Sequence, residues 1–251
     1  MRRNLVVGNW KMKINQQSAQ KLVDGLIEGL PSEDADIAVC PPYLYIPEVS
    51  QRLANTKIGL GAQNVATHVE GAYTGEIAAV MLKDFNCKYA IVGHSERRAN
   101  YADTSETVAQ RFQQAIDADI IPVLAIGELL EEREGGTTFD VVAKQLNAVI
   151  DFSGIENFKN AVIAYEPVWA IGTGLTASAE QAQEVHLFIR QLLLRKKDQQ
   201  IAENIQILYG GSVKPQNAIA LFAMPDIDGA LVGGDSLNAD SFLKIYSSFQ
   251  K

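Results

Sequence analysis

The sequence predicts an α/β protein folded as a (β/α)₈ barrel. Eight short runs of apolar, often β-branched residues recur along the chain, helical patterns occupy the intervals, and the length is 251 residues. The runs are continuous instead of alternating, which is typical of strands buried on both faces of a parallel sheet. Roughly 250 residues is also the usual length of a barrel with eight strand–helix units.

The predicted strands start 21 to 44 residues apart, which leaves room for a crossover helix each time. They are LVVGNW from Leu5, IAVCPP from Ile37, IGLGAQN from Ile58, YAIVGH from Tyr89, IPVLAIGE from Ile121, AVIAYEP from Ala161, IQILYGG from Ile205 and GALVGG from Gly229.

Four intervals carry a clear helical stripe of apolar residues. The stripes are Ala19, Leu22, Val23, Leu26, Ile27 and Leu30, stopped by Pro31; Val108, Phe112, Ala115 and Ile116; Ala182, Val185, Ile189, Leu192 and Leu193; and Phe242, Ile245, Tyr246 and Phe249. The third stripe is preceded by Ser178, with Gln181 three residues later, which is a capping-box pattern. No linker or change of composition divides the chain, so we expect one domain over residues 1–251.

A doubly wound open sheet fits the same periodicity and is the main alternative fold. That fold usually places a glycine-rich turn after its first strand. Here GNWKMK from Gly8 lacks the G-x-G-x-x-G spacing, and the chain has no Walker A sequence. The barrel is therefore favoured.

Composition excludes several classes of function. The formal net charge of −8 disfavours nucleic acid as a partner. No apolar run approaches the roughly 18 residues of a membrane span, and the N-terminal stretch does not resemble a signal peptide, so we expect a cytoplasmic protein without a membrane partner. Cys40 and Cys87 form no C-x-x-C pair, which predicts buried thiols in a reducing compartment.

Chemically useful side chains follow several of the predicted strands. In a barrel the carboxyl ends of all strands share one rim, where active sites are built. Glu166 ends an apolar strand and is a candidate base. His94 follows the fourth strand, where a helix can begin, and is a candidate acid or hydrogen-bond donor, while Lys11 supplies a fixed cation.

Glycine pairs follow the seventh and eighth strands, in YGGSV and VGGDSL. Glycine lets backbone N–H groups approach an anion closely, and barrels often bind phosphate at these two strand ends. No H-E-x-x-H occurs and the rim has no carboxylate cluster, so we expect neither a metal nor a cofactor. The combination suits proton abstraction next to a carbonyl in a small phosphorylated substrate.

Eight motifs occur in an order that resembles the triosephosphate isomerase family over essentially the whole chain. They are NWKM (9–12), GAQN (61–64), GAYTGE (71–76), GHSERR (93–98), AIGE (125–128), AYEPVWAIGTG (164–174), YGGSV (209–213) and LVGG (231–234). The resemblance implies a TIM barrel that interconverts dihydroxyacetone phosphate and D-glyceraldehyde 3-phosphate through an enediolate, in glycolysis and gluconeogenesis, without a cofactor. Another phosphosugar-binding barrel enzyme and a non-catalytic phosphate-binding barrel are the alternatives.

The same resemblance implies a role for each candidate residue. Glu166 would be the base and His94 the electrophile at the substrate oxygens, a pairing already described for this family. Lys11 would stabilise negative charge on oxygen, Asn9 would position the substrate, and Glu96 would pair with Lys11. The phosphate would be bound by backbone N–H groups of the residues Gly172, Ser212, Gly233 and Gly234.

Residues 167–174 resemble the mobile lid already described for this family. They are Pro167, Val168, Trp169, Ala170, Ile171, Gly172, Thr173 and Gly174. Pro167 fixes φ at one hinge, and the two glycines permit rearrangement at the other. The apolar residues between them would exclude water from the site.

The resemblance also implies a homodimer. GAYTGE would be a protruding loop that inserts into the other subunit, with Thr74 at its tip, and Glu76 would pair with Arg97 of the partner subunit.

Three residues depart from the family pattern. Ala125 stands where the family usually has Cys, Lys13 where Asn is common, and Asp235 where a small residue follows the glycine pair. A carboxylate near a phosphate dianion would repel it. We therefore expect the Asp235 side chain to point away from the phosphate or to be paired.

Overall fold

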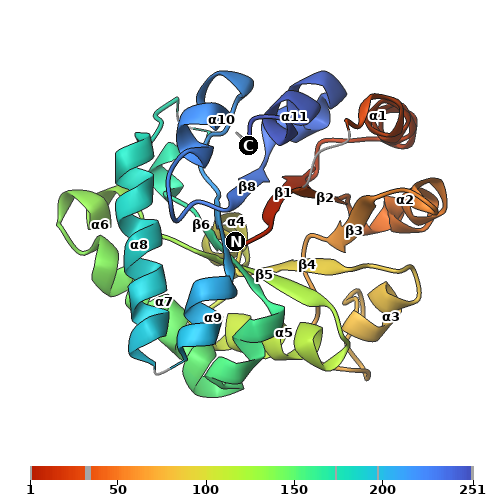
Figure 1. The fold of residues 1–251 in the computed structure, drawn as a ribbon. Helices are drawn as coiled ribbons and strands as arrows, with labels where there is room; N and C mark the ends of the chain where they lie inside the picture. Colours follow the sequence, from red (N-terminus) through yellow and green to blue (C-terminus); the bar gives the residue numbers. More distant parts are fainter. Residues whose placement is uncertain (1, 32–34, 173, 197, 250–251) are drawn as a thin grey trace.

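The structure is a computed structural model that describes residues 2–31, 35–172, 174–196 and 198–249. Parallel strands close a barrel in sequence order, from β1 round to β8, so the predicted (β/α)₈ fold is confirmed (Figure 1). The strands are β1 (Asn4–Asn9), β2 (Ala35–Cys40), β3 (Ile58–Ala62), β4 (Tyr89–Val92), β5 (Ile121–Ile126), β6 (Val162–Tyr165), β7 (Gln206–Tyr209) and β8 (Gly229–Val232). Each lies within two residues of its predicted start.

Helices surround the barrel and fill every interval between strands (Figure 1). The α-helices are α1 (Gln16–Gly29), α2 (Ile46–Leu53), α3 (Ala79–Lys83), α4 (Ser95–Tyr101), α5 (Ser105–Asp117), α6 (Leu130–Glu134), α7 (Thr138–Ser153), α8 (Ala179–Arg195), α9 (Gln199–Asn204), α10 (Pro215–Phe222) and α11 (Ala239–Tyr246). Short 3₁₀ helices are η1 (Tyr43–Tyr45), η2 (Ile155–Asn160), η3 (Val168–Ala170) and η4 (Gly234–Leu237).

Most residues of the predicted helical stripes are buried, whereas Leu30, Ile116 and Phe249 are half-buried and Ile27 is exposed. The capping box of α8 is present, since the Gln181 backbone N–H donates to Ser178 Oγ at 3.1 Å and the Ser178 N–H donates to Gln181 Oε1 at 2.9 Å. Ile27 lies at the edge of the α1 stripe and is 38% exposed. Phe249 lies beyond the end of α11 and stacks on Phe222 with ring centroids 4.3 Å apart.

Side chains fill the barrel interior, so the barrel has no pore. Alternate strand residues such as Leu5, Val7, Ile91 and Leu208 point inward and form one apolar cluster. The residues between them pack outward against the helices in a larger cluster. Because the interior is full, a ligand site has to lie at a rim of the barrel.

Cys40 and Cys87 are both buried free thiols, as the sequence predicted. Burial raises the pKa of Cys40 and raises that of Cys87 to about 12. Neither thiol is therefore poised as a nucleophile. Across the described ranges, no helix combines the length and the apolarity that spanning a bilayer requires.

Candidate active site

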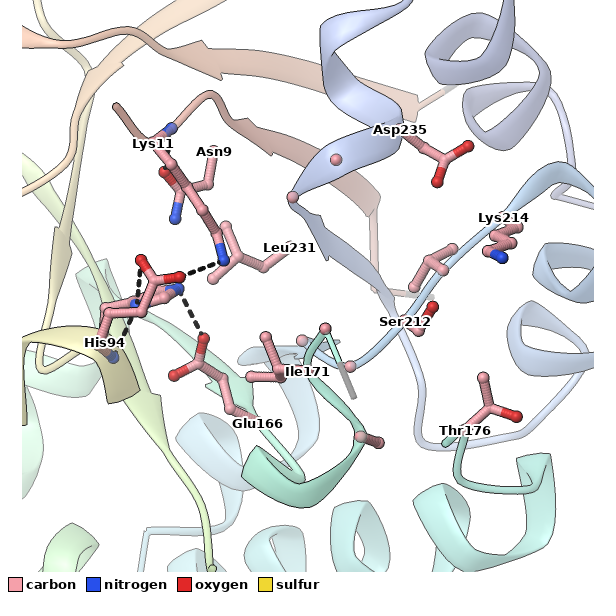
Figure 2. Close-up of a pocket in the computed structure, with 18 of the residues that line it drawn as sticks. Asn9, Lys11, His94, Glu166, Ile171, Thr176, Ser212, Lys214, Leu231 and Asp235 are labelled. Carbon is pink, nitrogen blue, oxygen red and sulfur yellow. Dashed lines mark hydrogen bonds and ion pairs between the residues drawn. The ribbon is translucent and has the colours of Figure 1, made fainter. Parts of the chain in front are cut away.

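A cavity of about 450 Å³ opens at the rim formed by the carboxyl ends of the strands. Figure 2 shows Glu166, His94 and Lys11 at one end of it. Ser212, Lys214 and Asp235 lie at the other end. The predicted site residues that line the cavity are Asn9, Lys11, His94, Glu96, Glu166, Ala170, Ile171, Gly172, Gly174, Ser212, Gly233 and Gly234.

Glu166 follows β6 directly and is 2% exposed. Its Oε1 lies 3.0 Å from His94 Nε2, and its Oε2 accepts a hydrogen bond of 2.9 Å from the Ser95 N–H. Gly210 makes room for this side chain, because a Cβ at that position would lie 2.8 Å from Glu166 Cγ. The carboxylate is thus held at the cavity wall by His94 and Ser95, at the start of α4.

His94 is the N-cap of α4, as the sequence pattern predicted. Its Nδ1 accepts a hydrogen bond of 3.2 Å from the Glu96 N–H. An acceptor nitrogen carries a lone pair, so the ring proton of a neutral imidazole is on Nε2. The side chain therefore offers one N–H donor, which points at Glu166.

Lys11 is held in an unusual backbone conformation after β1, with φ of 52°. Two amide side chains hold it there: Asn9 Oδ1 accepts from the Lys11 N–H at 3.1 Å, and Gln63 Nε2 donates to the Lys11 carbonyl at 3.0 Å. A non-glycine residue in this region stores strain of about 1–2 kcal/mol and persists only when its surroundings fix it. Sequence reasoning did not identify Gln63 as a site residue, although it lies within the GAQN motif.

The Lys11 ammonium forms an ion pair with Glu96, with Nζ 2.6 Å from Oε1. Partial burial alone would raise the pKa of Glu96, but the hydrogen bond from Lys11 and the nearby positive charges hold that pKa below its usual value. Glu96 is therefore ionised at neutral pH and fixes the direction of the Lys11 side chain.

At the other end of the cavity, the chain turns tightly after β7 and β8. Gly233 faces Lys11, and a Cβ there would lie 3.4 Å from Lys11 Cε. At Gly211 a Cβ would collide with the Tyr209 hydroxyl, at 2.2 Å. A small residue is thus required at Gly211, whereas at Gly233 a Cβ would be in ordinary contact with the Lys11 side chain.

The expectation that the Asp235 carboxylate points away from a bound phosphate or is paired stays a prediction. Asp235 is half-buried and lines the same cavity as Ser212. Within the part of the chain that the structure describes, none of the ion pairs includes it. Its carboxylate is turned away from Lys11 and Glu166, on the side of Lys214 (Figure 2).

The predicted lid begins at Pro167, with φ of −65°, and continues as η3. Ala170 and Ile171 line the cavity, whereas Trp169 packs partly buried against the core. Gly172 and Gly174 both have positive φ, at 71° and 86°, which fits the predicted glycine hinge. Thr173 lies outside the described residues.

Glu128, at the end of β5, anchors this segment. The fully buried carboxylate accepts hydrogen bonds from Trp169 Nε1 at 2.9 Å and from the Tyr165 hydroxyl at 3.0 Å. Burial raises the pKa of Glu128, and the hydrogen bond from Trp169 opposes that shift. Sequence reasoning placed Glu128 at a strand end but gave it no role, because its partners lie far along the chain.

Comparison with known proteins settles the family. The family model described as "Triosephosphate isomerase" matches residues 4–249. The chain belongs to the triosephosphate isomerase family.

Curated relatives named triosephosphate isomerase match over nearly their full length. The chain is 52% identical to the protein of Methylococcus capsulatus over 248 residues, covering 99% of both chains. It is 53% identical to that of Hydrogenovibrio crunogenus, covering 98% of this chain and 97% of the relative. It is 54% identical to that of Pseudomonas putida, covering 96% of each.

The other departures from the pattern of the triosephosphate isomerase family are structurally mild. Ala125 is fully buried, and its carbonyl accepts from Arg98 Nη2 at 3.2 Å. Lys13 is exposed at the mouth of the cavity. In the described parts of the chain, no three or more His, Cys, Asp or Glu side chains are grouped so that they could hold a metal ion.

The residues predicted at a subunit interface lie outside the cavity. Arg97 Nε is 2.8 Å from Asp103 Oδ2, and Glu76 Oε2 is 3.6 Å from Arg111 Nη1 of the same chain. The pairing of Glu76 with Arg97 of the partner subunit stays a prediction.

Proposed function

We propose that the protein interconverts dihydroxyacetone phosphate and D-glyceraldehyde 3-phosphate by proton transfer through an enediolate, without a cofactor. The observation that carries this proposal is the contact of 3.0 Å between Glu166 Oε1 and His94 Nε2, in one cavity with Lys11 and the two glycine turns. The reaction belongs to glycolysis and gluconeogenesis, and we place it in the cytoplasm.

Glu166 is the base of the proposed reaction. It takes a proton from one substrate carbon and returns it to the neighbouring carbon. To reach the substrate, its carboxylate leaves the Ser95 N–H, which holds Oε2 in the present conformation. The Glu166 side chain can rotate about its own bonds while its Cα stays fixed at the end of β6.

His94 supplies the electrophile. Since Nδ1 accepts from the Glu96 N–H, the Nε2–H is the group that donates to the substrate carbonyl oxygen and then to the enediolate oxygens. A neutral donor can hand over a proton and receive it back without a large change in free energy. Lys11 adds a positive charge beside the same oxygens, and Asn9 positions the substrate from the same strand end.

The phosphate binds at the far end of the cavity. Backbone N–H groups of Gly172, Ser212, Gly233 and Gly234 are its proposed donors, because glycine turns after β7 and β8 suit an anion. Closure of the lid brings Gly172 to the phosphate and removes water from the enediolate, which could otherwise lose its phosphate.

Deuterium exchange in heavy water tests the reaction. Dihydroxyacetone phosphate is incubated with the protein in heavy water and followed by NMR. We expect protein-dependent deuterium uptake at the carbon next to the carbonyl, with formation of the aldehyde. Exchange no faster than in buffer would exclude the isomerase and leave the non-catalytic phosphate-binding barrel.

A Glu166→Gln variant is the matched control. It keeps the shape of the side chain but has no basic carboxylate, so we expect exchange to fall by about 10²- to 10⁴-fold. Full exchange by this variant would assign the proton transfer to another residue, as expected for a different phosphosugar barrel enzyme.

We also propose that the protein is a homodimer. Large exposed apolar side chains gather in segments that follow β1 to β4. They are Met12, Leu44, Val69, Tyr73, Val80, Met81, Phe85 and Tyr101. An apolar surface of this kind favours an interface between subunits. Thr74 follows the exposed Tyr73 in the loop after β3, and this loop would insert into the other subunit near its site.

A further inference from the structure

Asp235 is a charge at the phosphate end of the cavity that the proposed reaction does not use. It follows Gly234 in η4, is half-buried, and lines the cavity. A carboxylate at this place acts on any anion that enters, because two like charges a few ångströms apart repel each other inside a partly desolvated pocket.

Lys214 is the opposing charge at the same end. It precedes α10 and lines the cavity, and it lies on the same side as Asp235 and Ser212 in Figure 2. The Lys11 ammonium is 2.6 Å from Glu96 Oε1, and a Cβ at Gly233 would lie 3.8 Å from Lys11 Nζ, so Lys11 borders the turn after β8 but is already paired. Asp235 and Lys214 therefore add their charges to those of Lys11 and Lys13, which also line the cavity.

We propose that Asp235 and Lys214 together set the affinity of the cavity for phosphate dianions: the carboxylate weakens binding and the ammonium group strengthens it. The proposal rests on the proposed function, which places the substrate phosphate at the end of the cavity that these two side chains line. It applies equally to the substrate and to free inorganic phosphate, which carries the same charge. The Asp235 carboxylate therefore limits occupation of the site by inorganic phosphate, while the chemistry at Glu166 is untouched.

The test compares Asp235→Asn, Lys214→Gln and the double variant. We expect Asp235→Asn to lower both KM for D-glyceraldehyde 3-phosphate and the inhibition constant of inorganic phosphate by about three- to tenfold. Lys214→Gln raises both constants by a similar factor, and the double variant returns close to the parent. Added salt shrinks every difference, because the residues are partly exposed.

D-glyceraldehyde, which has no phosphate, separates this role from a structural one. Its kcat/KM is expected to be the same in all variants, since Asp235 and Lys214 act on the phosphate alone. Asp240→Asn, an exposed carboxylate on α11 outside the cavity, is the matched control and leaves both constants unchanged.

Two results would overturn the proposal. One is an Asp235→Asn variant whose KM and phosphate inhibition constant equal those of the parent. The other is an equal change with D-glyceraldehyde, which would show a general distortion of the site. Failure of the proposed function is seen separately, as a parent protein that shows no deuterium exchange. In that case titration of the parent and the variants with inorganic phosphate, followed by ³¹P NMR, measures the effect of the two charges on phosphate affinity.

Discussion

At the scale of single residues, burial decides which histidine works and which only packs. His94 reaches the cavity, whereas His186 on α8 is fully buried. The His186 Nδ1 lies 3.1 Å from the Asp226 carbonyl oxygen, which can only accept, so Nδ1 carries the proton. Charging this ring would add a second proton inside the core beside Arg190. Burial accordingly lowers the pKa of His186 to about 3.

This histidine makes stability depend on pH. Its folded-state pKa of about 3 lies below the ordinary value of 6.5, so the unfolded chain binds protons more tightly. The contribution of His186 to the free energy of unfolding is complete above pH 6.5 and is lost as the pH falls towards 3. By pH 5 this loss amounts to about 2 kcal/mol. We expect His186→Asn, which keeps a donor near Nδ1 but does not titrate, to lose correspondingly less stability between pH 7.5 and pH 5.

Urea unfolding at both pH values and at one protein concentration measures the difference. His68→Asn, which removes an exposed histidine from the loop after β3, is the matched control. An equal loss of stability in the parent and in His186→Asn would refute the assignment of this pH dependence to His186.

At the scale of elements, the predicted lid is joined to Glu166, the proposed base, at a single peptide. Glu166 is fixed on β6 by its N–H, which donates to the Ile126 carbonyl at 2.8 Å, and Pro167 follows at once. Beyond it, η3 is anchored to β5 through the Trp169 contact with Glu128. The proline therefore separates a rigid strand end from a segment that has to move.

Replacing Pro167 by Ala frees φ at this junction and adds conformations to the open lid. We expect Glu166 to stay in place and closure to become less complete, so that kcat falls by about tenfold and more enediolate loses its phosphate. Steady-state kinetics and the release of inorganic phosphate measure both effects. Pro215→Ala, at the start of α10, is the control; kinetics like those of the parent for Pro167→Ala would make Pro167 a turn former only.

At the scale of the whole molecule, the exposed apolar residues are unevenly distributed. Leu44 in the η1 segment is 80% exposed and Met12 is 93% exposed, and Met12 directly follows Lys11, which lines the cavity. If this face is the subunit interface, dimerisation buries apolar area and supports the loops that hold Lys11 and His94.

Leu44→Glu places a charge on that face. We expect it to weaken the dimer by at least tenfold in dissociation constant, because a buried unpaired carboxylate is costly. Size-exclusion chromatography with light scattering at several concentrations measures the change, and activity is expected to fall as monomer accumulates. Leu187→Glu, on an exposed position of α8, is the control; a parent protein that is monomeric at every concentration would exclude the interface.

The sequence by itself determined the strands and the four helices whose apolar stripes it carries, α1, α5, α8 and α11, because burial periodicity, caps and glycine turns are local properties. It could place Glu166, His94 and Lys11 at one rim once the barrel was predicted. The stripe residues that are not fully buried are Ile27, Leu30, Ile116 and Phe249. They lie at the edges or ends of helical stripes, where a neighbouring element decides burial.

Tertiary structure alone decided how those residues meet. The Ser95 N–H that holds Glu166 lies 71 positions away, and the Glu96 that pairs with Lys11 lies 85 positions away. The anchoring of the lid on Glu128, the strained backbone of Lys11 held by Gln63, and the place of Asp235 beside Lys214 follow likewise from closure of the barrel. Such contacts are set by the register and twist of eight strands, which no local pattern encodes.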